Sequence, residues 1–493
     1  MSVWERATRI ATLAVVLLVF SLAGCGGGGG DGSRGAVVTV GTSADVTERD
    51  GAVSLREALQ LANGELVTTD LDAKELDNVR RAPGAASADT IVFDPVAFPN
   101  GQPATITLTA NLPPLSGGND TVDGSSAGVI IDGNGEVQEL TCLTVTSSGN
   151  SLKGLQVQNC RTAILIDRGA EANTIGGTTP GERNVVSGNP GVGIEIRSVG
   201  NIVIGNYIGT DATGTVAMPN DLEGVWIGPG GRDNRIGGST AKERNVISGN
   251  KLFGVSITGE ATGNTVQGNY IGLNAAGTAG IRNNFGVLLG QGAQNNIVGG
   301  SAPGERNVVS GNGAGILIRR ANTSNNLVQG NIIGPDPDAI EMIGNAYGVW
   351  LVDGAQHNVV GGTLAGEGNL IAGNDSAVVA EGLDTIGNTI RGNSIYENLT
   401  RAIATVEGGN AELAQPLLEG ANPVRGTACP NCTVDIYSDE GNEGRTYDGS
   451  TLADADGRFV FDGETAGPNI TTTATDADGN TSAFSEPVRG SRP

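Results

Sequence analysis

The sequence predicts an all-β protein whose main part is a parallel β-helix, a coil with three short strands in each turn. "ERNVISGN" (243–250) has close copies at 182–189, 305–312 and 367–374, so one unit recurs every 61 or 62 residues. A G-V-x-I segment recurs roughly every 30 residues, so each unit consists of two half-units. Gly provides 80 of the 493 residues and aromatic residues only 3%, which excludes helical repeats and favours short strands with tight turns.

Each half-unit contains three apolar segments in a fixed order, first G-V-x-I and then two segments of the form N-x-I/V. Residues 254–272 show this order in "GVSITGEATGNTVQGNYIG". Three strands in each turn would stack successive turns about 4.8 Å apart along the axis of the coil. A β-propeller would instead need blades of four longer antiparallel strands. The repeat therefore predicts a parallel β-helix.

An Asn residue begins the third strand of every half-unit. Asn tolerates left-handed backbone geometry, and its amide both donates and accepts hydrogen bonds. Such side chains, stacked turn after turn, would bond along the axis as a ladder, and the Val and Ile residues after them would form an aliphatic core. The predicted ladder consists of Asn184, Asn206, Asn245, Asn269, Asn307, Asn331, Asn369 and Asn393.

A Glu-Arg pair precedes this Asn in three of the units. The glutamates are Glu182, Glu243 and Glu305. They could be repeated binding groups, but solvated charge pairs between each Glu and its neighbouring Arg are the favoured interpretation. The repeated octapeptide is thus interpreted mainly as an architectural unit.

The N-terminal region, residues 1–24, is typical of an export signal. Arg6 and Arg9 precede the apolar stretch 10–24, which is shorter than the roughly 20 residues of a membrane span. "LAGC" (22–25) resembles a bacterial lipobox, which implies cleavage before Cys25 and a lipid on its thiol. A plain secretory peptide is the alternative. Residues 25–35 would form a Gly-rich tether, so the protein is expected to be exported and anchored to the bacterial membrane through Cys25 only.

The mature chain divides into two predicted parts. Residues 36–412 form the β-helix with an N-terminal cap, because "VSLREALQLAN" (53–63) is a helix with a capping box at Ser54 and Glu57. Its apolar face would cover the open end of the coil. Residues 413–490 alternate apolar and polar residues between Gly and Asp turns, which predicts a small antiparallel β-sandwich.

Charge and cysteine content restrict the partners. The net charge of −24 disfavours nucleic acid, and it also repels polyanionic sugars unless calcium or an Arg patch intervenes. In an exported chain, Cys429 and Cys432 favour a disulfide over a redox or zinc site. Whether Cys142 and Cys160 pair is left open. We expect a monomer without a metal site, and calcium is the one cofactor that the sequence leaves open.

Several motifs resemble those of a known class. These are "SLREAL" (54–59), "ADTIVFD" (88–94), the "GERNVVSGN" and "GNYIGTDATGT" repeats, and "DADGNTSAFSE" (476–486). The chain resembles bacterial secreted proteins with the right-handed parallel β-helix of the pectin-lyase-like fold. That fold contains pectate lyases, polygalacturonases, epimerases and non-catalytic surface proteins, so the resemblance implies a fold and leaves the activity open. The C-terminal segment resembles carboxypeptidase-regulatory-like or immunoglobulin-like accessory domains.

The resemblance implies two kinds of catalytic site, and the sequence offers candidate residues for one of them. Lyases of this class are expected to combine carboxylates, calcium and a basic group. Asp167, Glu195 and Arg197 lie on consecutive first strands and are the candidates. Polygalacturonase-like enzymes are expected to use several Asp and a His on neighbouring turns, but His357 is the only His and is predicted to lie on the surface.

Three acidic loops resemble parts of calcium sites. "PDPDAIE" (335–341) could hold calcium, but a turn rigidified by Pro is the favoured interpretation. The two "DADG" stretches (454–457 and 476–479) are interpreted as hairpin turns, because they lack the remaining ligands. No complete catalytic or metal constellation is evident. The leading hypothesis is therefore a non-catalytic surface protein that binds glycan or protein, and the alternative is a polysaccharide lyase, glycoside hydrolase or epimerase.

One row of side chains suggests a binding surface. In G-V-x-I the x side chain should point outward, because the alternation directs Val and Ile into the core. Trp226 and Trp350 lie in this row, and flat indole rings stack on sugars. Two interpretations stay open, an exposed glycan-binding groove and a row covered by loops. The row reads Glu195, Trp226, Ser256, Leu288, Leu317 and Trp350.

Overall fold

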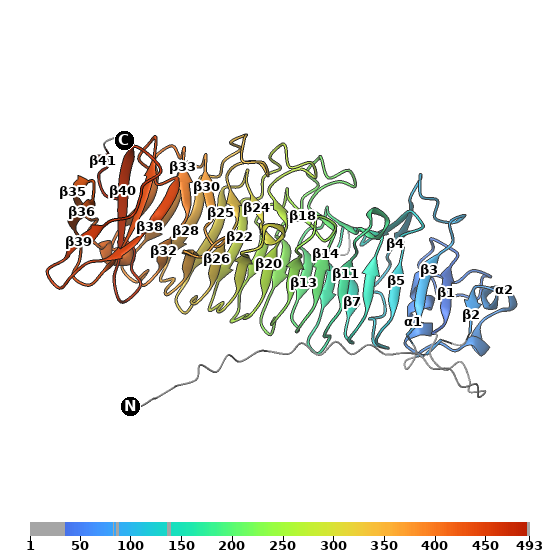
Figure 1. The fold of residues 1–493 in the computed structure, drawn as a ribbon. Helices are drawn as coiled ribbons and strands as arrows, with labels where there is room; N and C mark the ends of the chain where they lie inside the picture. The colour runs from blue at the N-terminus through green and yellow to red at the C-terminus, as the bar shows by residue number, and fades with distance from the viewer. Residues whose placement is uncertain (1–34, 82, 85–87, 136–139, 491–493) are drawn as a thin grey trace, which may run out of the picture. The chain divides into compact units, whose positions relative to one another are not determined.

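The computed structural model describes residues 35–81, 83–84, 88–135 and 140–490. In this part of the chain, three sheets of 10, 13 and 11 strands form a right-handed parallel β-helix, as predicted (Figure 1). Their strands pair in parallel, except that β2 pairs antiparallel with β1 at one end of the second sheet. Two small antiparallel sheets follow at the C-terminal end. The predicted signal segment and Cys25 lie outside the described residues. No helix in the described part has the length and apolar character that a membrane span requires.

The first sheet contains the G-V-x-I strands, one from each turn, and its strands pair in parallel with the next turn. Its strands are β7 (Thr141–Val145), β10 (Thr162–Ile166), β13 (Val192–Ile196), β16 (Glu223–Ile227), β19 (Phe253–Ile257), β22 (Phe285–Gly290), β25 (Ala314–Arg319), β28 (Tyr347–Val352), β31 (Ser376–Glu381) and β34 (Arg401–Val406).

The second and third sheets contain the two N-x-I/V strands of each turn. The second sheet consists of β2 (Val79–Arg80), β1 (Val37–Val40), β3 (Thr90–Phe93), β5 (Thr121–Asp123), β8 (Ser151–Lys153), β11 (Thr174–Gly176), β14 (Ile202–Ile204), β17 (Arg235–Gly237), β20 (Thr265–Gln267), β23 (Ile297–Gly299), β26 (Leu327–Gln329), β29 (Val359–Gly361) and β32 (Thr389–Arg391). The third consists of β4 (Ala104–Thr107), β6 (Val129–Asp132), β9 (Leu155–Gln158), β12 (Val185–Val186), β15 (Tyr207–Ile208), β18 (Val246–Ile247), β21 (Tyr270–Ile271), β24 (Val308–Val309), β27 (Ile332–Ile333), β30 (Leu370–Ala372) and β33 (Ser394–Tyr396).

The core lies inside the coil and is made of stacked aliphatic rows. On the first sheet, Val225 pairs with Val255, which pairs with Val287, and all three side chains are fully buried. The Gly of G-V-x-I is required by this stacking. A Cβ atom on Gly254 would lie 2.6 Å from the carbonyl oxygen of Gly286 on the next turn, closer than any side chain tolerates.

The predicted Asn ladder is confirmed. Each amide nitrogen donates to the amide oxygen of the next member, for example Asn245 to Asn269 at 2.9 Å and Asn269 to Asn307 at 3.0 Å. Asn184 starts the series and Asn369 donates to Asn393 at its end. The eight side chains are buried, so their hydrogen bonds along the axis are shielded from water.

Two of the repeated glutamates form ion pairs, as expected, but their partners are not the Arg residues beside them. Glu182 lies 3.1 Å from Lys153, and Glu243 lies 3.0 Å from Arg235. Glu182 accepts hydrogen bonds from the backbone N–H groups of Thr178 and Thr179, which closes the loop before it. The guanidinium of Arg183 instead lies 3.9 Å from the centre of the Tyr207 ring on the next turn. Both side chains therefore stabilise the coil. Their contacts could not be predicted from the fact that Glu182 and Arg183 are neighbours in the sequence.

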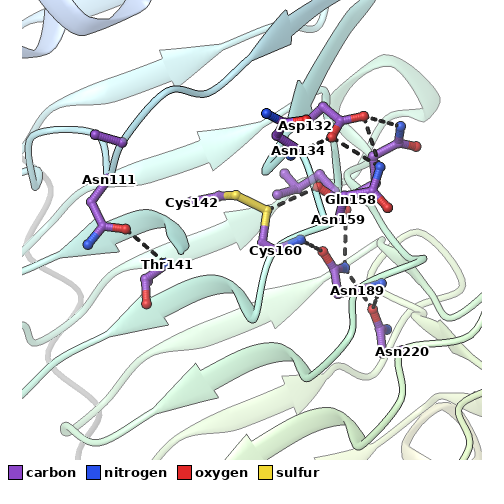
Figure 2. Close-up of a disulfide and its surroundings, with 12 residues drawn as sticks. Asn111, Asp132, Asn134, Thr141, Cys142, Gln158, Asn159, Cys160, Asn189 and Asn220 are labelled. Atoms are coloured by element: carbon purple, nitrogen blue, oxygen red, sulfur yellow. Dashed lines mark hydrogen bonds between the residues drawn. A yellow bond between two sulfur atoms is a disulfide. The ribbon is translucent and has the colours of Figure 1, made fainter. Parts of the chain in front are cut away.

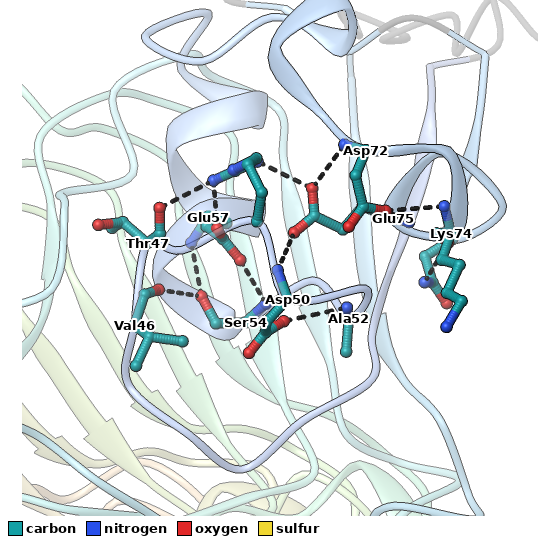
Figure 3. A network of polar contacts seen from close by, with 11 residues as sticks. Val46, Thr47, Asp50, Ala52, Ser54, Glu57, Asp72, Lys74 and Glu75 are labelled. Atoms are coloured by element: carbon teal, nitrogen blue, oxygen red, sulfur yellow. Dashed lines mark hydrogen bonds and ion pairs between the residues drawn. The ribbon is translucent and has the colours of Figure 1, made fainter.

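Helix α1 (Leu55–Ala62) covers the first turn with a buried apolar side, as predicted. Ser54 and Glu57 form the capping box, in which the Glu57 carboxylate accepts from the Ser54 N–H at 2.9 Å. Arg49 bonds both Glu57 and Glu75, whose carboxylates are fully buried. Figure 3 shows Glu57 and Glu75 within one network of polar contacts. Burial raises the pKa of Glu57. The other described helices are α2 (Ala73–Leu76), η1 (Thr68–Asp70), η2 (Pro180–Glu182), η3 (Pro303–Glu305) and η4 (Gly409–Glu412).

Two disulfides are present in the described residues. Cys142 on β7 is bonded to Cys160, which follows β9, so this bond links neighbouring turns (Figure 2). The Cys160 N–H donates to the Asn189 side chain at 3.0 Å. The second disulfide joins Cys429 to Cys432 across a tight loop.

The C-terminal sheets cover part of the last turn of the coil. Asp435 receives two hydrogen bonds of 2.6 Å from Arg391, and Tyr437 accepts one of 2.9 Å from the Gly392 N–H. Strand edges of the second and third sheets are thereby shielded. One sheet contains β35 (Leu417–Ala421), β36 (Val424–Thr427) and β39 (Arg458–Phe461), and the other β38 (Thr446–Leu452), β37 (Thr433–Asp439), β40 (Asn469–Thr475) and β41 (Val488–Arg489).

Candidate functional site

The x residues of G-V-x-I lie in one continuous line on the outer surface of the first sheet. The strand register pairs Trp226 with Glu195 on one side and with Ser256 on the other. Their flanking Val and Ile residues are fully buried in the core, so the x side chains point outward. The register continues through Leu288 and Leu317 to Trp350.

The side chains in the middle of this outward row are buried, whereas two others, the tryptophans, are partly exposed to solvent. Ser256, Leu288 and Leu317 are only 1%, 6% and 1% exposed. Trp226 and Trp350 are partly exposed. The row is therefore neither a continuous open groove nor fully covered, and both alternatives from the sequence describe part of it.

Hydrogen bonds hold the two indole rings in place. The Trp226 ring N–H donates to the Thr258 hydroxyl at 2.8 Å, and the Trp350 ring N–H donates to the Glu381 carboxylate at 3.0 Å. Trp226 and Trp350 are four turns apart, which corresponds to about 19 Å along the axis. Fixed rings at this separation can contact one extended chain at two points.

A second row beside the first contains three more aromatic residues. Phe253 and Phe285 stack with their ring centres 5.2 Å apart, and Tyr347 stacks on Trp350 at 4.6 Å. All three rings are partly exposed. These three rings were not predicted, although an aromatic residue stands directly before the Gly in "FGVSI", "FGVLL" and "YGVWL".

The structure brings together two of the three catalytic candidates. Glu195 is 4% exposed, and its carboxylate is 2.5 Å from the Arg197 guanidinium. Asp167 directly follows β10 on the preceding turn, and nothing in the described residues bonds its carboxylate to the other two. A carboxylate that the sequence analysis did not single out, Glu223, lies next to this pair. Burial raises the pKa of Glu223, and the negative charge of Glu195 adds to the increase.

The acidic loops are turns closed by their own carboxylates. Asp336 accepts from the backbone N–H groups of Ile340 and Glu341 at 2.7 and 3.1 Å, and Asp454 accepts from that of Arg458 at 2.7 Å. His357 is exposed in a loop. In the parts of the chain that the structure describes, no three His, Cys, Asp or Glu side chains gather as a metal site.

The sheets and their outward rows define a right-handed parallel β-helix protein with an aromatic face on its first sheet. An A-module of mannuronan C-5 epimerase from Azotobacter vinelandii is 16% identical, with a TM-score of 0.33 over 65% of this chain and 80% of that one. The surface adhesin PfbA of Streptococcus pneumoniae is 12% identical, with a TM-score of 0.35 over 81% and 85%. No protein-family model matches the chain, and no curated protein matches its sequence.

Proposed function

We propose that this protein is a lipid-anchored protein of the bacterial cell surface or periplasm that binds a glycan along its first sheet without catalysing a reaction. The observation that carries the proposal is the grouping of five partly exposed aromatic rings in two adjoining rows of one face. Only 3% of the chain is aromatic, so this grouping is a concentrated one. Aromatic rings present flat apolar surfaces on which sugar rings stack.

The non-catalytic part of the proposal rests on the state of the carboxylates. A general base must reach the proton that it removes. Glu195 is buried and bonded to Arg197, which leaves its carboxylate little access to a bound chain. Asp167 is not bonded to this pair, so the candidates do not form a joint acid–base group.

A polysaccharide lyase, hydrolase or epimerase is the second candidate, and Glu223 favours it. Its raised pKa and the ion-paired Glu195 give two neighbouring carboxyl groups in different environments. Such pairs supply acid and base roles in glycan-cleaving enzymes. Product release by the wild type from any glycan, lost in both Glu195→Gln and Glu223→Gln, would establish this function and refute the non-catalytic one.

Replacement of both tryptophans tests the glycan-binding face. The Trp226→Ala/Trp350→Ala protein is expected to bind a cognate oligosaccharide roughly 30-fold more weakly, because each ring contributes on the order of 1 kcal/mol. Titration calorimetry of a hit from a glycan array measures the change. Trp226→Phe/Trp350→Phe should retain most of the affinity, and Tyr207→Ala, on the third sheet, should retain all of it. Equal affinity of the double Ala variant and wild type would refute the face as the binding surface.

The anchor is tested at Cys25. Cys25→Ala is expected to move the protein from the membrane fraction to a soluble or unprocessed form, because the thiol that would carry the lipid is absent. Metabolic labelling with a fatty acid, followed by fractionation, measures both properties. An unlabelled wild type whose membrane association matches that of Cys25→Ala would contradict the lipoprotein assignment.

A further inference from the structure

A pocket of about 380 Å³ lies where the chain leaves the first sheet and turns towards the second. Three consecutive turns line it, those that follow β19, β22 and β25. These strands carry Ser256, Leu288 and Leu317, the closed middle of the outward row. The lining residues are Glu260, Thr262, Gln291, Gly292, Gln294, Ala321 and Asn322.

The backbone of these turns holds the pocket in shape. Glu260, Gln291 and Asn322 adopt left-handed conformations with φ of 63°, 51° and 63°. The N–H of Gln294 donates to the Ala261 carbonyl at 3.2 Å, which ties neighbouring turns together. A Cβ atom on Gly292 would lie 3.1 Å from the Glu260 side chain, so the absence of a side chain at this position keeps the pocket open.

The pocket presents uncharged donors and acceptors together with one carboxylate. The amides of Gln291, Gln294 and Asn322 and the hydroxyl of Thr262 can each both donate and accept. The amide nitrogen of Gln294 donates to the Asn322 carbonyl at 3.1 Å, which orients the amide and leaves its oxygen as an acceptor. Sugar hydroxyls also donate and accept, so this set matches an unmodified sugar ring.

The charge around the pocket disfavours an acidic sugar. None of its lining residues is a Lys or Arg, and Glu260 would repel a carboxylate. Of the cations beside the pocket, Arg319 bonds Asp353 at 2.6 Å. Arg320, which precedes the lining residue Ala321, and Arg232, which pairs in register with Thr262, are exposed, so the only charge in the lining itself is that of Glu260. The net charge of −24 acts in the same direction.

The pocket lies close in the chain to one residue that holds the aromatic face in place. The Trp226 ring N–H bonds the hydroxyl of Thr258, which precedes Glu260 by two residues in the same turn. A chain stacked on Trp226 can therefore extend towards the pocket. Three turns span about 10 Å along the axis, which is enough for two sugar units.

We propose that this pocket is a subsite for uncharged hexose units, so that the protein binds a neutral polysaccharide and discriminates against polyuronates. The inference rests on the proposed glycan-binding function and specifies its ligand class. Discrimination follows from hydrogen bonds to sugar hydroxyls combined with repulsion of carboxylates.

The test is titration calorimetry of the full chain with two sets of hexamers. The neutral set contains gluco-, manno- and galacto-hexaoses, and the acidic set contains hexamers of galacturonate and mannuronate. The pocket variant is Gln291→Gly/Asn322→Gly, since Gly tolerates the left-handed backbone at both positions. The matched control is Ala172→Gly/Ala339→Gly, two left-handed positions with φ of 54° and 56° outside the pocket.

We expect a neutral hexaose to bind wild type and the control equally, and the pocket variant at least tenfold more weakly. Binding of the acidic hexamers alone would overturn the inference and leave the proposed function standing. The inference would also be overturned, and the proposed function would stand, if the pocket variant still bound a neutral hexaose while Trp226→Ala/Trp350→Ala did not. Absence of binding to both sets would overturn the inference together with the glycan-binding function.

Discussion

Replacement of Asn269 by leucine is expected to lower the thermal unfolding midpoint by several degrees, because one buried side chain serves three turns. Its oxygen accepts from the Asn245 amide, and its nitrogen donates to the Asn307 oxygen and to the Ile236 carbonyl at 2.8 Å. Leucine removes these three bonds, and the buried partners keep only part of their hydrogen bonding, such as the bond from the Asn245 amide to the Val203 carbonyl at 2.8 Å. Each such loss costs about 1–3 kcal/mol.

The matched control for this prediction is an Asn on the surface. Asn442 is exposed in a loop of the C-terminal sheets, so Asn442→Leu should leave the midpoint near that of wild type. Calorimetric or circular-dichroism melts of the three proteins measure the effect. A midpoint for Asn269→Leu within error of wild type would mean that the ladder does not stabilise the coil.

The sequence predicted the ladder because its eight Asn residues hold a constant place, directly before the Val or Ile of the third strand. Two further ladders were missed. One runs along the second sheet, directly before its strands, where Asn264 donates to Asn296 at 2.9 Å. The other precedes the first sheet, where Asn250 donates to Asn283 at 3.0 Å. In the ladder that precedes the first sheet, every second Asn, such as Asn283, follows a loop whose length varies from turn to turn. The common position of these Asn residues in the turn was therefore not recognisable from the sequence.

The direction of side chains was predictable, but their exposure was not. Alternation along each strand correctly placed Trp226 and Leu317 in one outward row. Leu317 is nevertheless 1% exposed, since burial of an outward residue depends on the size and lean of side chains one turn away. Those neighbours lie about 30 residues apart in the chain, because each turn of this repeat has that length. Phe253 and Phe285 stack for the same reason, and their pairing also escaped the sequence analysis.

Replacement of Asp120 by asparagine is expected to stabilise the protein at neutral pH and to change its response to acid. The ladder of the second sheet ends at two carboxyl groups, where Asp120 and Asp89 occupy positions that Asn fills elsewhere. The Asp120 N–H donates to the Asn150 oxygen at 2.9 Å, and the Asp89 N–H donates to one Asp120 oxygen at 2.9 Å. In the next turn Asn150 uses its amide nitrogen to donate to Asn173 at 2.9 Å. Asp120 has an oxygen in place of that nitrogen.

This second oxygen, Oδ2, is buried and has no hydrogen-bond partner in the described residues. Burial raises the pKa of Asp120 to about 6 from an ordinary 3.8, and the negative charge of Asp89 adds to the increase. The protonated form is therefore favoured in the folded state. Its contribution to stability is fully present below pH 3.8, decreases as the pH rises, and is lost above about pH 6.

Asparagine at position 120 would restore a donor without a charge, so the stability of Asp120→Asn should no longer decline between pH 4 and 6 for this reason. The increase in the pKa of Asp120 corresponds to about 3 kcal/mol. The free energy of unfolding of Asp120→Asn at pH 7 is therefore expected to exceed that of wild type by an amount of this order. Unfolding midpoints in urea at several pH values between 4 and 8 measure this difference in stability for wild type, Asp120→Asn and the exposed control Asp384→Asn. The control should follow wild type at every pH. A lower stability of Asp120→Asn than of wild type at pH 7 would contradict this prediction. It would mean that the folded protein requires the ionised Asp120 carboxylate at this place in the ladder.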